Sequence, residues 1–274
     1  MKSPPDKITL NALFASFWYQ RKLILKLTRR EVQARYRGSI FGLFWSLFQP
    51  VLMLMIYTFI FSFVFEVRWG KELESRYDFA LLLFIGLIVH AFFAECLNRS
   101  PRQIHGNIIF VKRIMFPIEI FSWVTICVAL FQAAINYLVL QVFFSLVHGT
   151  IHWTVLLIPI VFAPLIILTS GICWFLAASG VYFRDINETI QILTLALLFL
   201  APVFYPVSAL PPPFRPFIFI NPITFIIEQA RAVIIWGAMP NWPGLIIYYA
   251  LALLTAWFGF ATFRKFRGRF ADVL

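Results

Sequence analysis

The sequence predicts an all-α polytopic membrane protein, and composition, segment length and charge distribution each support this fold class. Of its 274 residues, 61% are hydrophobic and 13% are charged, and the mean hydropathy is +0.85. Soluble domains average about 45–50% apolar and about 25% charged residues. Because both values depart in the same direction, we expect lipid to be the solvent around most of the chain.

Six apolar segments are long enough to cross a bilayer, which takes about 20 residues of helix. The third and fourth exceed that length, so we expect tilt or kinks there, with Pro159 and Pro164 as candidate kink sites. The six predicted spans are 39–66, 78–98, 117–147, 154–182, 189–206 and 243–263.

Basic residues set the predicted orientation. The net charge of +11 would favour nucleic-acid binding in a soluble protein, but here basic loops on one side of a bilayer explain it, so no nucleic-acid partner is expected. With both termini cytoplasmic, the inner side carries nine Lys or Arg in 1–38, four in 98–116, Arg184, and four in 264–269. The opposite side carries five, which favours this topology over its inverse.

The region 1–38 predicts an amphipathic helix. Leu10, Leu13, Phe14 and Phe17 recur at helical spacing. An apolar stripe with a basic face is typical of a helix lying in the membrane interface, although a helix packed on a partner protein would show the same pattern. The apolar core of a cleavable signal peptide has about 7–15 residues, and the next apolar run of this chain is much longer. We therefore expect the first span to be retained. The basic residues that follow the stripe are Arg21, Lys22, Lys26, Arg29 and Arg30.

The stretch "VYFRDINETIQ" (181–191) places Arg184, Asp185 and Glu188 between two apolar runs. In the predicted topology it is a short cytoplasmic turn between the fourth and fifth spans. Asp185 and Glu188 have the spacing of a capping box, which would satisfy free amides at a helix start. The alternative is a buried catalytic or proton-relay carboxylate in the membrane.

The apolar part of the region 207–242 is too short to cross the membrane. After Pro222 the apolar run contains about 14 residues and includes Glu228 and Arg231, and a crossing there would place the basic tail 264–274 outside. We therefore expect two short re-entrant helices at the outer face, broken around Asn221 and Pro222. Glu228 and Arg231 are three residues apart and can pair on one helix face.

The sequence offers no catalytic or metal-binding constellation. It lacks a nucleotide-binding loop, a zinc signature and a G-x-S-x-G motif. Cys96, Cys127 and Cys173 all fall in apolar segments and are expected to pack in the core. His148 and His152 flank a short outer loop, where solvated side chains are expected rather than a metal pair. The chain is therefore not expected to be an enzyme or to hold a cofactor.

The stretch "HGNIIFVKR" (105–113) predicts a short cytoplasmic helix with exposed Ile108, Ile109 and Phe110. Exposed apolar side chains of this kind mark an interaction site, or else they lie on lipid headgroups. The residues of this candidate site are His105, Gly106, Asn107, Ile108, Ile109, Phe110, Val111, Lys112 and Arg113.

Four blocks in order make the sequence resemble the membrane subunits of ABC-type polysaccharide exporters, the family that exports O-antigen, capsule and teichoic acid. The resemblance covers nearly the whole chain, and the order and spacing of the blocks make it specific. The blocks are "REVQARYRGSIFGLFWSLFQP" (30–50), "FVKRIMFPIEI" (110–120), "YFRDINETIQIL" (182–193) with "LAPVFYPVSALP" (200–211), and "NPITFIIEQAR" (221–231).

The resemblance implies a type-2 ABC exporter architecture in the bacterial inner membrane. This chain would be half of a homodimer that works with two copies of a separate ATPase, which bind ATP and Mg²⁺. Residues 105–113 would be the coupling helix, and Asn221, Pro222, Glu228 and Arg231 would belong to gate helices at the periplasmic mouth. The single domain 1–274 would comprise an interface helix (1–38), spans one to five (39–206), gate helices (207–242), span six (243–263) and a cytoplasmic tail (264–274).

The resemblance also implies that spans one and five line a channel between the two copies. Aromatic rings recur on one face of span one and near the end of span five, and rings can stack against sugars through weak, repeated contacts. An aromatic stripe is also common on lipid-facing and packed helix faces, so both interpretations stay open. The candidate channel residues are Phe41, Trp45, Phe48, Phe59, Phe199, Phe204 and Tyr205.

The expected function is therefore ATP-driven export of a lipid-linked, O-antigen-like polysaccharide as part of lipopolysaccharide biosynthesis. One alternative is an exporter of the same type for a drug or small lipid. Another is a membrane-embedded glycosyl- or acyl-transferase, but Glu66, Glu95 and Glu119 do not cluster at one membrane face. An ion-driven transporter would usually show internal repeats, and none is apparent.

Overall fold

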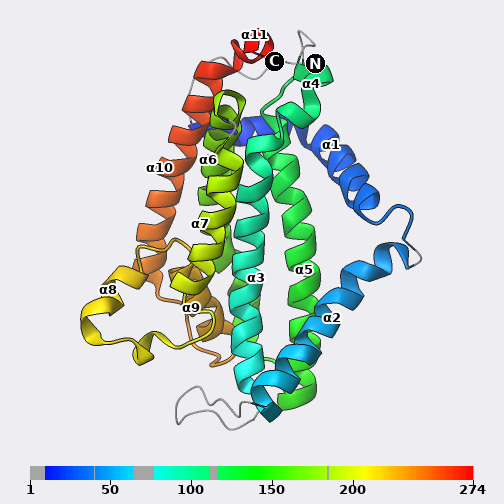
Figure 1. Cartoon of the computed structure of the whole chain (residues 1–274). Helices are drawn as coiled ribbons and strands as arrows, with labels where there is room; N and C mark the ends of the chain where they lie inside the picture. Colours follow the sequence, from blue (N-terminus) through cyan, green and yellow to red (C-terminus); the bar gives the residue numbers. More distant parts are fainter. Residues whose placement is uncertain (1–9, 40, 65–76, 112–115, 184, 274) are drawn as a thin grey trace.

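The computed structural model describes residues 10–39, 41–64, 77–111, 116–183 and 185–273, and within them it is an all-helical bundle without strands (Figure 1). The helices in chain order are α1 (Leu10–Arg35), α2 (Trp45–Thr58), α3 (Asp78–Arg99), α4 (Ile108–Val111), α5 (Ile120–His148), α6 (Ile158–Tyr182), α7 (Ile186–Leu200), α8 (Arg215–Ile218), α9 (Thr224–Ile234), α10 (Trp242–Arg267) and α11 (Phe270–Val273).

Five helical segments are long and apolar enough to cross a membrane: Gly42–Phe61, Asp78–Arg102, Ile120–His148, Trp153–Tyr182 and Trp242–Arg267. They match the predicted spans one, two, three, four and six. Each helical segment either extends beyond its predicted span or begins a few residues inside it. The last one continues as helix through Arg267, so the predicted cytoplasmic tail 264–274 begins as helix.

The predicted fifth span, 189–206, is the exception. It forms the 15-residue α7, which ends at Leu200. Ala201 adopts an extended conformation because it precedes Pro202, whose ring disfavours helical backbone at the preceding residue. At a rise of 1.5 Å per residue, α7 is roughly 22 Å long, less than the hydrocarbon thickness of about 30 Å.

α3 occupies the centre of the bundle. It packs against α2, α5, α6, α7 and α9, and 72% of the residues in an apolar 18-residue stretch of its span are buried. In the span that contains α2, the same fraction is 22%, so α2 lies at the edge, as Figure 1 shows. α2 therefore presents most of its surface to lipid or to another protein.

α6 and α10 pack most closely of all the helix pairs. Gly171 of α6 and Gly259 of α10 face each other, and a Cβ added to Gly259 would lie 1.9 Å from the Gly171 carbonyl oxygen. Small residues permit this approach, as is common between membrane helices. Pro164 lies inside α6, and Pro159 is at its first turn, where proline is tolerated. The kinks expected at these two residues stay predictions.

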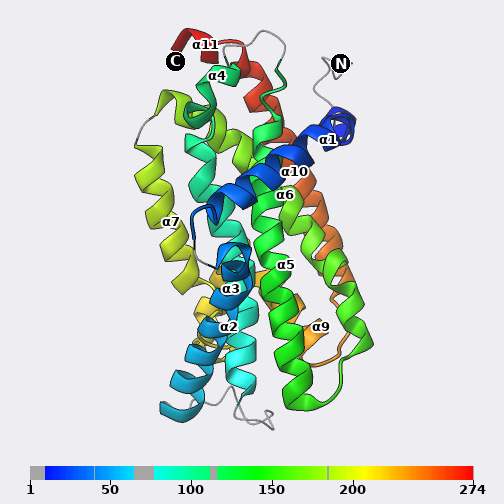
Figure 2. The same ribbon diagram turned by 90° about the vertical axis from the view of Figure 1, so that its right-hand side faces the viewer.

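The two ends of the bundle differ. α1, α4 and α11 gather at one end, which we call the basic end because the described Lys and Arg of α1 and of the last turn of α10 lie there (Figures 1 and 2). The segments α8 and α9 lie toward the other end, which we call the far end. A helix thus covers most of 1–38 as predicted, while its place in a membrane interface stays a prediction.

Candidate functional site

The predicted coupling segment is held firmly at its start. The Asn107 side-chain amide donates to the Gln103 carbonyl oxygen at 2.9 Å, and the His105 ring lies 3.2 Å from the Gly180 carbonyl oxygen. The side chain of Gln103 itself binds Ser122 and Thr125 of α5. The segment is therefore fixed to α5 and α6 before α4 begins.

The apolar side chains of α4 divide into two groups. Ile109 is 74% exposed, as predicted. Phe110 is half-buried and packs against Phe116 and Phe121, with ring centroids 4.8 and 6.1 Å apart, so its predicted full exposure is wrong. Ile108 is also half-buried. Lys112 and Arg113 lie outside the described residues.

Ion pairs join α1 to α3 beside this segment. Arg35 binds Glu95, and Arg99 binds Glu31 and lies 3.5 Å from Glu95. Burial alone would lower the pKa of Arg35, but the hydrogen bond and charge of Glu95 outweigh it and raise this pKa above its ordinary value. Arg35 therefore keeps its positive charge at neutral pH, and its ion pair with Glu95 fastens α1 to α3.

Glu119 joins the start of α5 to the end of α10. Its side chain is 1% exposed, and its Oε1 lies 3.8 Å from Arg264 and 3.3 Å from Arg267. The Glu119 carbonyl oxygen also accepts a hydrogen bond from the Trp174 indole at 3.1 Å. Glu119 therefore ties the start of α5 to the last turn of α10 and to α6.

The turn between α6 and α7 differs from its prediction. Arg184 lies outside the described residues. Asp185 is the N-cap residue of α7, but its backbone is helical and its side chain makes no capping hydrogen bond. Glu188 lies 3.3 Å from Arg102, and both side chains are exposed. The predicted capping box is thus wrong, because Glu188 faces a cation from a distant part of the chain.

The aromatic candidates form two groups. In the first span, Phe41, Phe48 and Phe59 are 58%, 40% and 61% exposed, and the half-buried Trp45 touches Phe41 and Phe48 edge-to-face. At the end of α7 the exposed Phe199 stacks on the half-buried Phe204 at 5.8 Å, and the half-buried Tyr205 donates to the Phe199 carbonyl oxygen. Both host helices contact α3.

The region 207–242 is broken near the predicted place. α8 ends at Ile218 and α9 starts at Thr224, so Asn221 and Pro222 lie in the connection. The Asn221 amide donates to the Leu197 carbonyl oxygen at 3.0 Å, which ties this connection to α7.

Arg231 fixes α9 against the centre of the bundle. Its side chain is fully buried and lies 2.8 Å from Glu228, the pair that their spacing predicts. It also donates to the carbonyl oxygens of Leu82 at 3.0 and 3.2 Å and Val203 at 3.2 Å. The contacts to α3 and to the α7–α8 connection join residues far apart in sequence, so nothing in the local pattern indicates them.

The histidines that flank the outer loop contact other side chains. His148 Nε2 lies 2.9 Å from Asp78, and the rings of His148 and His152 lie at tilted angles to Phe144. Within the described part of the chain, no group of three His, Cys, Asp or Glu side chains could hold a metal ion.

Comparison with known proteins identifies the family to which the chain belongs. Residues 22–235 match the model of the ABC-2 type transporter family. The chain belongs to this family. Its membership and its five long apolar helices make it a multi-pass membrane protein.

Several relatives within this family align over almost their full length. The chain is 26% identical over 258 residues to the O-antigen export system permease protein RfbA of Klebsiella pneumoniae, which covers 93% of this chain and 96% of that protein. It is 24% identical to the RfbA protein of Myxococcus xanthus, over 95% and 98% of the two chains. It is 23% identical to the polysialic acid transport protein KpsM of Escherichia coli, over 91% and 95%.

Proposed function

We propose that this chain is the membrane subunit of an ATP-driven exporter that moves a lipid-linked, O-antigen-like polysaccharide across the bacterial inner membrane. The observation that carries the proposal is the end-to-end similarity to permeases named for O-antigen export and polysialic acid transport.

The chain works as a homodimer with two copies of a separate ATPase in this proposal. The exposed surface of α2 supports a second copy, since an apolar helix with so few buried residues needs lipid or protein around it. The exposed Ile109 on the firmly held segment 105–111 supports contact with a partner at the basic end. The ATPase partner binds ATP and Mg²⁺, and this chain supplies the passage.

The polymer passes between the two copies, along the aromatic groups of the first span and of α7. Phe41, Phe48, Phe59 and Phe199 are exposed within one chain, as a surface that contacts cargo across a dimer interface must be. The basic end faces the cytoplasm, and α8 and α9 gate the far end. α7 and the residues after it form the fifth crossing, which brings the total to six and places α1 and α11 on the same side.

The test is deletion of the gene in its own host, with surface glycan and intracellular lipid-linked glycan measured separately. We expect surface polymer to disappear and lipid-linked polymer to accumulate inside, and complementation with the intact gene to restore both pools. If both pools stay normal, polysaccharide is not the cargo, and export of a drug or small lipid becomes the better hypothesis.

A further inference from the structure

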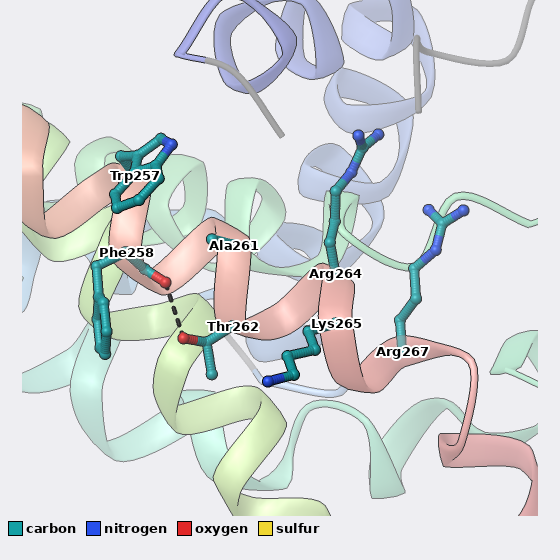
Figure 3. A pocket seen from close by; sticks show the side chains of 7 residues that line it. All are labelled: Trp257, Phe258, Ala261, Thr262, Arg264, Lys265 and Arg267. Atoms are coloured by element: carbon teal, nitrogen blue, oxygen red, sulfur yellow. Dashed lines mark hydrogen bonds between the residues drawn. The ribbon is translucent and has the colours of Figure 1, made fainter. Parts of the chain in front are cut away.

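We propose that the last three turns of α10 bind an anionic phospholipid of the surrounding membrane. A groove of about 800 Å³ opens along this part of the helix (Figure 3). Its described lining changes from aromatic to basic within about two turns. The proposal goes beyond export and does not depend on which cargo the protein carries.

The first part of the groove is apolar. Trp257 and Phe258 are 44% and 55% exposed, and Ala261 leaves space between the larger side chains. The Thr262 hydroxyl donates to the Phe258 carbonyl oxygen at 2.8 Å, so its polar group is satisfied within the helix. This part of the groove therefore suits a hydrocarbon chain.

The position of the groove along α10 matches the edge of the hydrocarbon layer. Residues 242–263 contain no charged side chain and span roughly 33 Å as helix, close to the hydrocarbon thickness of about 30 Å. Arg264 is the first cation after this run. Trp257 and Phe258 thus lie at acyl-chain depth, and the basic residues lie at headgroup depth.

The second part of the groove is basic. Arg264, Lys265 and Arg267 line it, and Figure 3 shows the two arginines on one side of α10 and Lys265 pointing to the other. Glu119 faces both arginines. Lys265 is exposed. A phosphate group is complementary to the charge of this lysine.

The location favours a membrane phospholipid over the lipid carrier of the proposed cargo. α10 packs along α6, and in both Figures 1 and 2 it lies across the bundle from α2, where the proposed passage runs. The groove accordingly faces the surrounding bilayer. The occupant is then a lipid with an acyl chain beside Phe258 and a phosphate beside Lys265, whose side chains lie on the same side of α10 in Figure 3.

The test is native mass spectrometry of the full-length protein with equal amounts of phosphatidylglycerol and phosphatidylcholine. We expect the wild type to retain phosphatidylglycerol preferentially. Lys265→Gln should lower that preference about five-fold, the effect of removing one cation near the headgroups. Ala261→Phe keeps every charge and fills the groove, so it should lower retention as well.

A matched control separates a site from general surface charge. Lys22→Gln removes an exposed lysine of α1 at the same end of the bundle and should leave the preference unchanged. Equal retention of the two lipids by the wild type would overturn the proposal, as would an equal effect of Lys22→Gln and Lys265→Gln. Displacement of phosphatidylglycerol by an equal amount of polyprenyl diphosphate, abolished in Ala261→Phe, would assign the groove to the lipid carrier instead.

Discussion

Arg231 lies where α3, α9 and the α7–α8 connection meet, and its guanidinium is bonded to groups from all three. Arginine suits this place because its planar fork can serve several oxygens at once and keeps its charge when buried. The nearby Gly86 leaves room for it, since a Cβ there would lie 3.4 Å from the Arg231 guanidinium and 3.2 Å from Val203. One side chain thus holds α9 and the α7–α8 connection against α3.

Replacing Arg231 by leucine tests this role. Arg231→Leu removes the donors to Leu82 and Val203 and leaves Glu228 without its partner, so we expect a loss of about 3 kcal/mol of stability. Arg231→Lys keeps the charge but cannot serve all the acceptors, so its loss should be smaller. Reversible denaturation in detergent measures both.

Arg215 provides the matched control. It also donates to two carbonyl oxygens, those of Leu210 and Ser208, but these contacts are exposed. Water can replace them, so Arg215→Leu should cost less than about 1 kcal/mol. Equal losses for Arg215→Leu and Arg231→Leu would show that the buried position of Arg231 adds nothing.

At the scale of elements, the contact of α6 with α10 depends on two glycines. A Cβ on Gly171 would lie 2.3 Å from the Thr255 carbonyl oxygen, and one on Gly259 would meet Gly171 itself. These neighbours are backbone atoms that cannot turn away. We expect Gly259→Ala to separate the helices and lower the yield of folded protein in size-exclusion chromatography.

Gly268 is the control for this substitution on the same helix end. Its φ is −65° and nothing lies within 4 Å of an added Cβ. Gly268→Ala should leave the yield unchanged or slightly raise stability, because alanine restricts the unfolded chain. A normal elution profile for Gly259→Ala would mean that the two helices are not packed as the structure has them.

The sequence predicted the elements that depend on properties of neighbouring residues alone, such as the length of an apolar segment. Five spans were predicted because apolar length alone specifies them, and α5 ends after His148 because Gly149 adopts a left-handed conformation. α7 was predicted too long, since hydropathy does not register that Pro202 ends a helix at the residue before it. The capping box at Asp185 failed because Glu188 pairs with Arg102, a contact between segments that only the fold brings together.

The same division holds for the candidate site. The spacing of Glu228 and Arg231 predicted their pair, but the further partners of Arg231 are more than 25 residues away along the chain. Exposure of Ile109 was predicted, whereas the burial of Phe110 depends on Phe121 of the next helix. The roles of 105–113, of the aromatic groups and of the far-end helices stay predictions.

At the scale of the whole molecule, the charge distribution predicts the orientation. α1 and the end of α10 bring Lys and Arg to the basic end. The α7–α8 connection, which contains Ser208, lies toward the far end (Figure 1). Basic segments stay on the cytoplasmic side during insertion. We therefore expect Ser208 on the outer side of the inner membrane and Gly268 on its cytoplasmic side.

Single cysteine substitutions at these two positions measure the orientation. Ser208→Cys should react with a membrane-impermeant maleimide in spheroplasts, and Gly268→Cys should react only after permeabilisation, because both positions are exposed but lie on opposite sides. The native cysteines give little background, since Cys96 and Cys173 are buried and Cys127 is half-buried, and the wild type records what remains. Labelling of both positions in spheroplasts would place an even number of crossings between them, so α10 could not be the single crossing that joins them. Labelling of Gly268→Cys alone would invert the protein, and the basic end could then not meet a cytoplasmic ATPase.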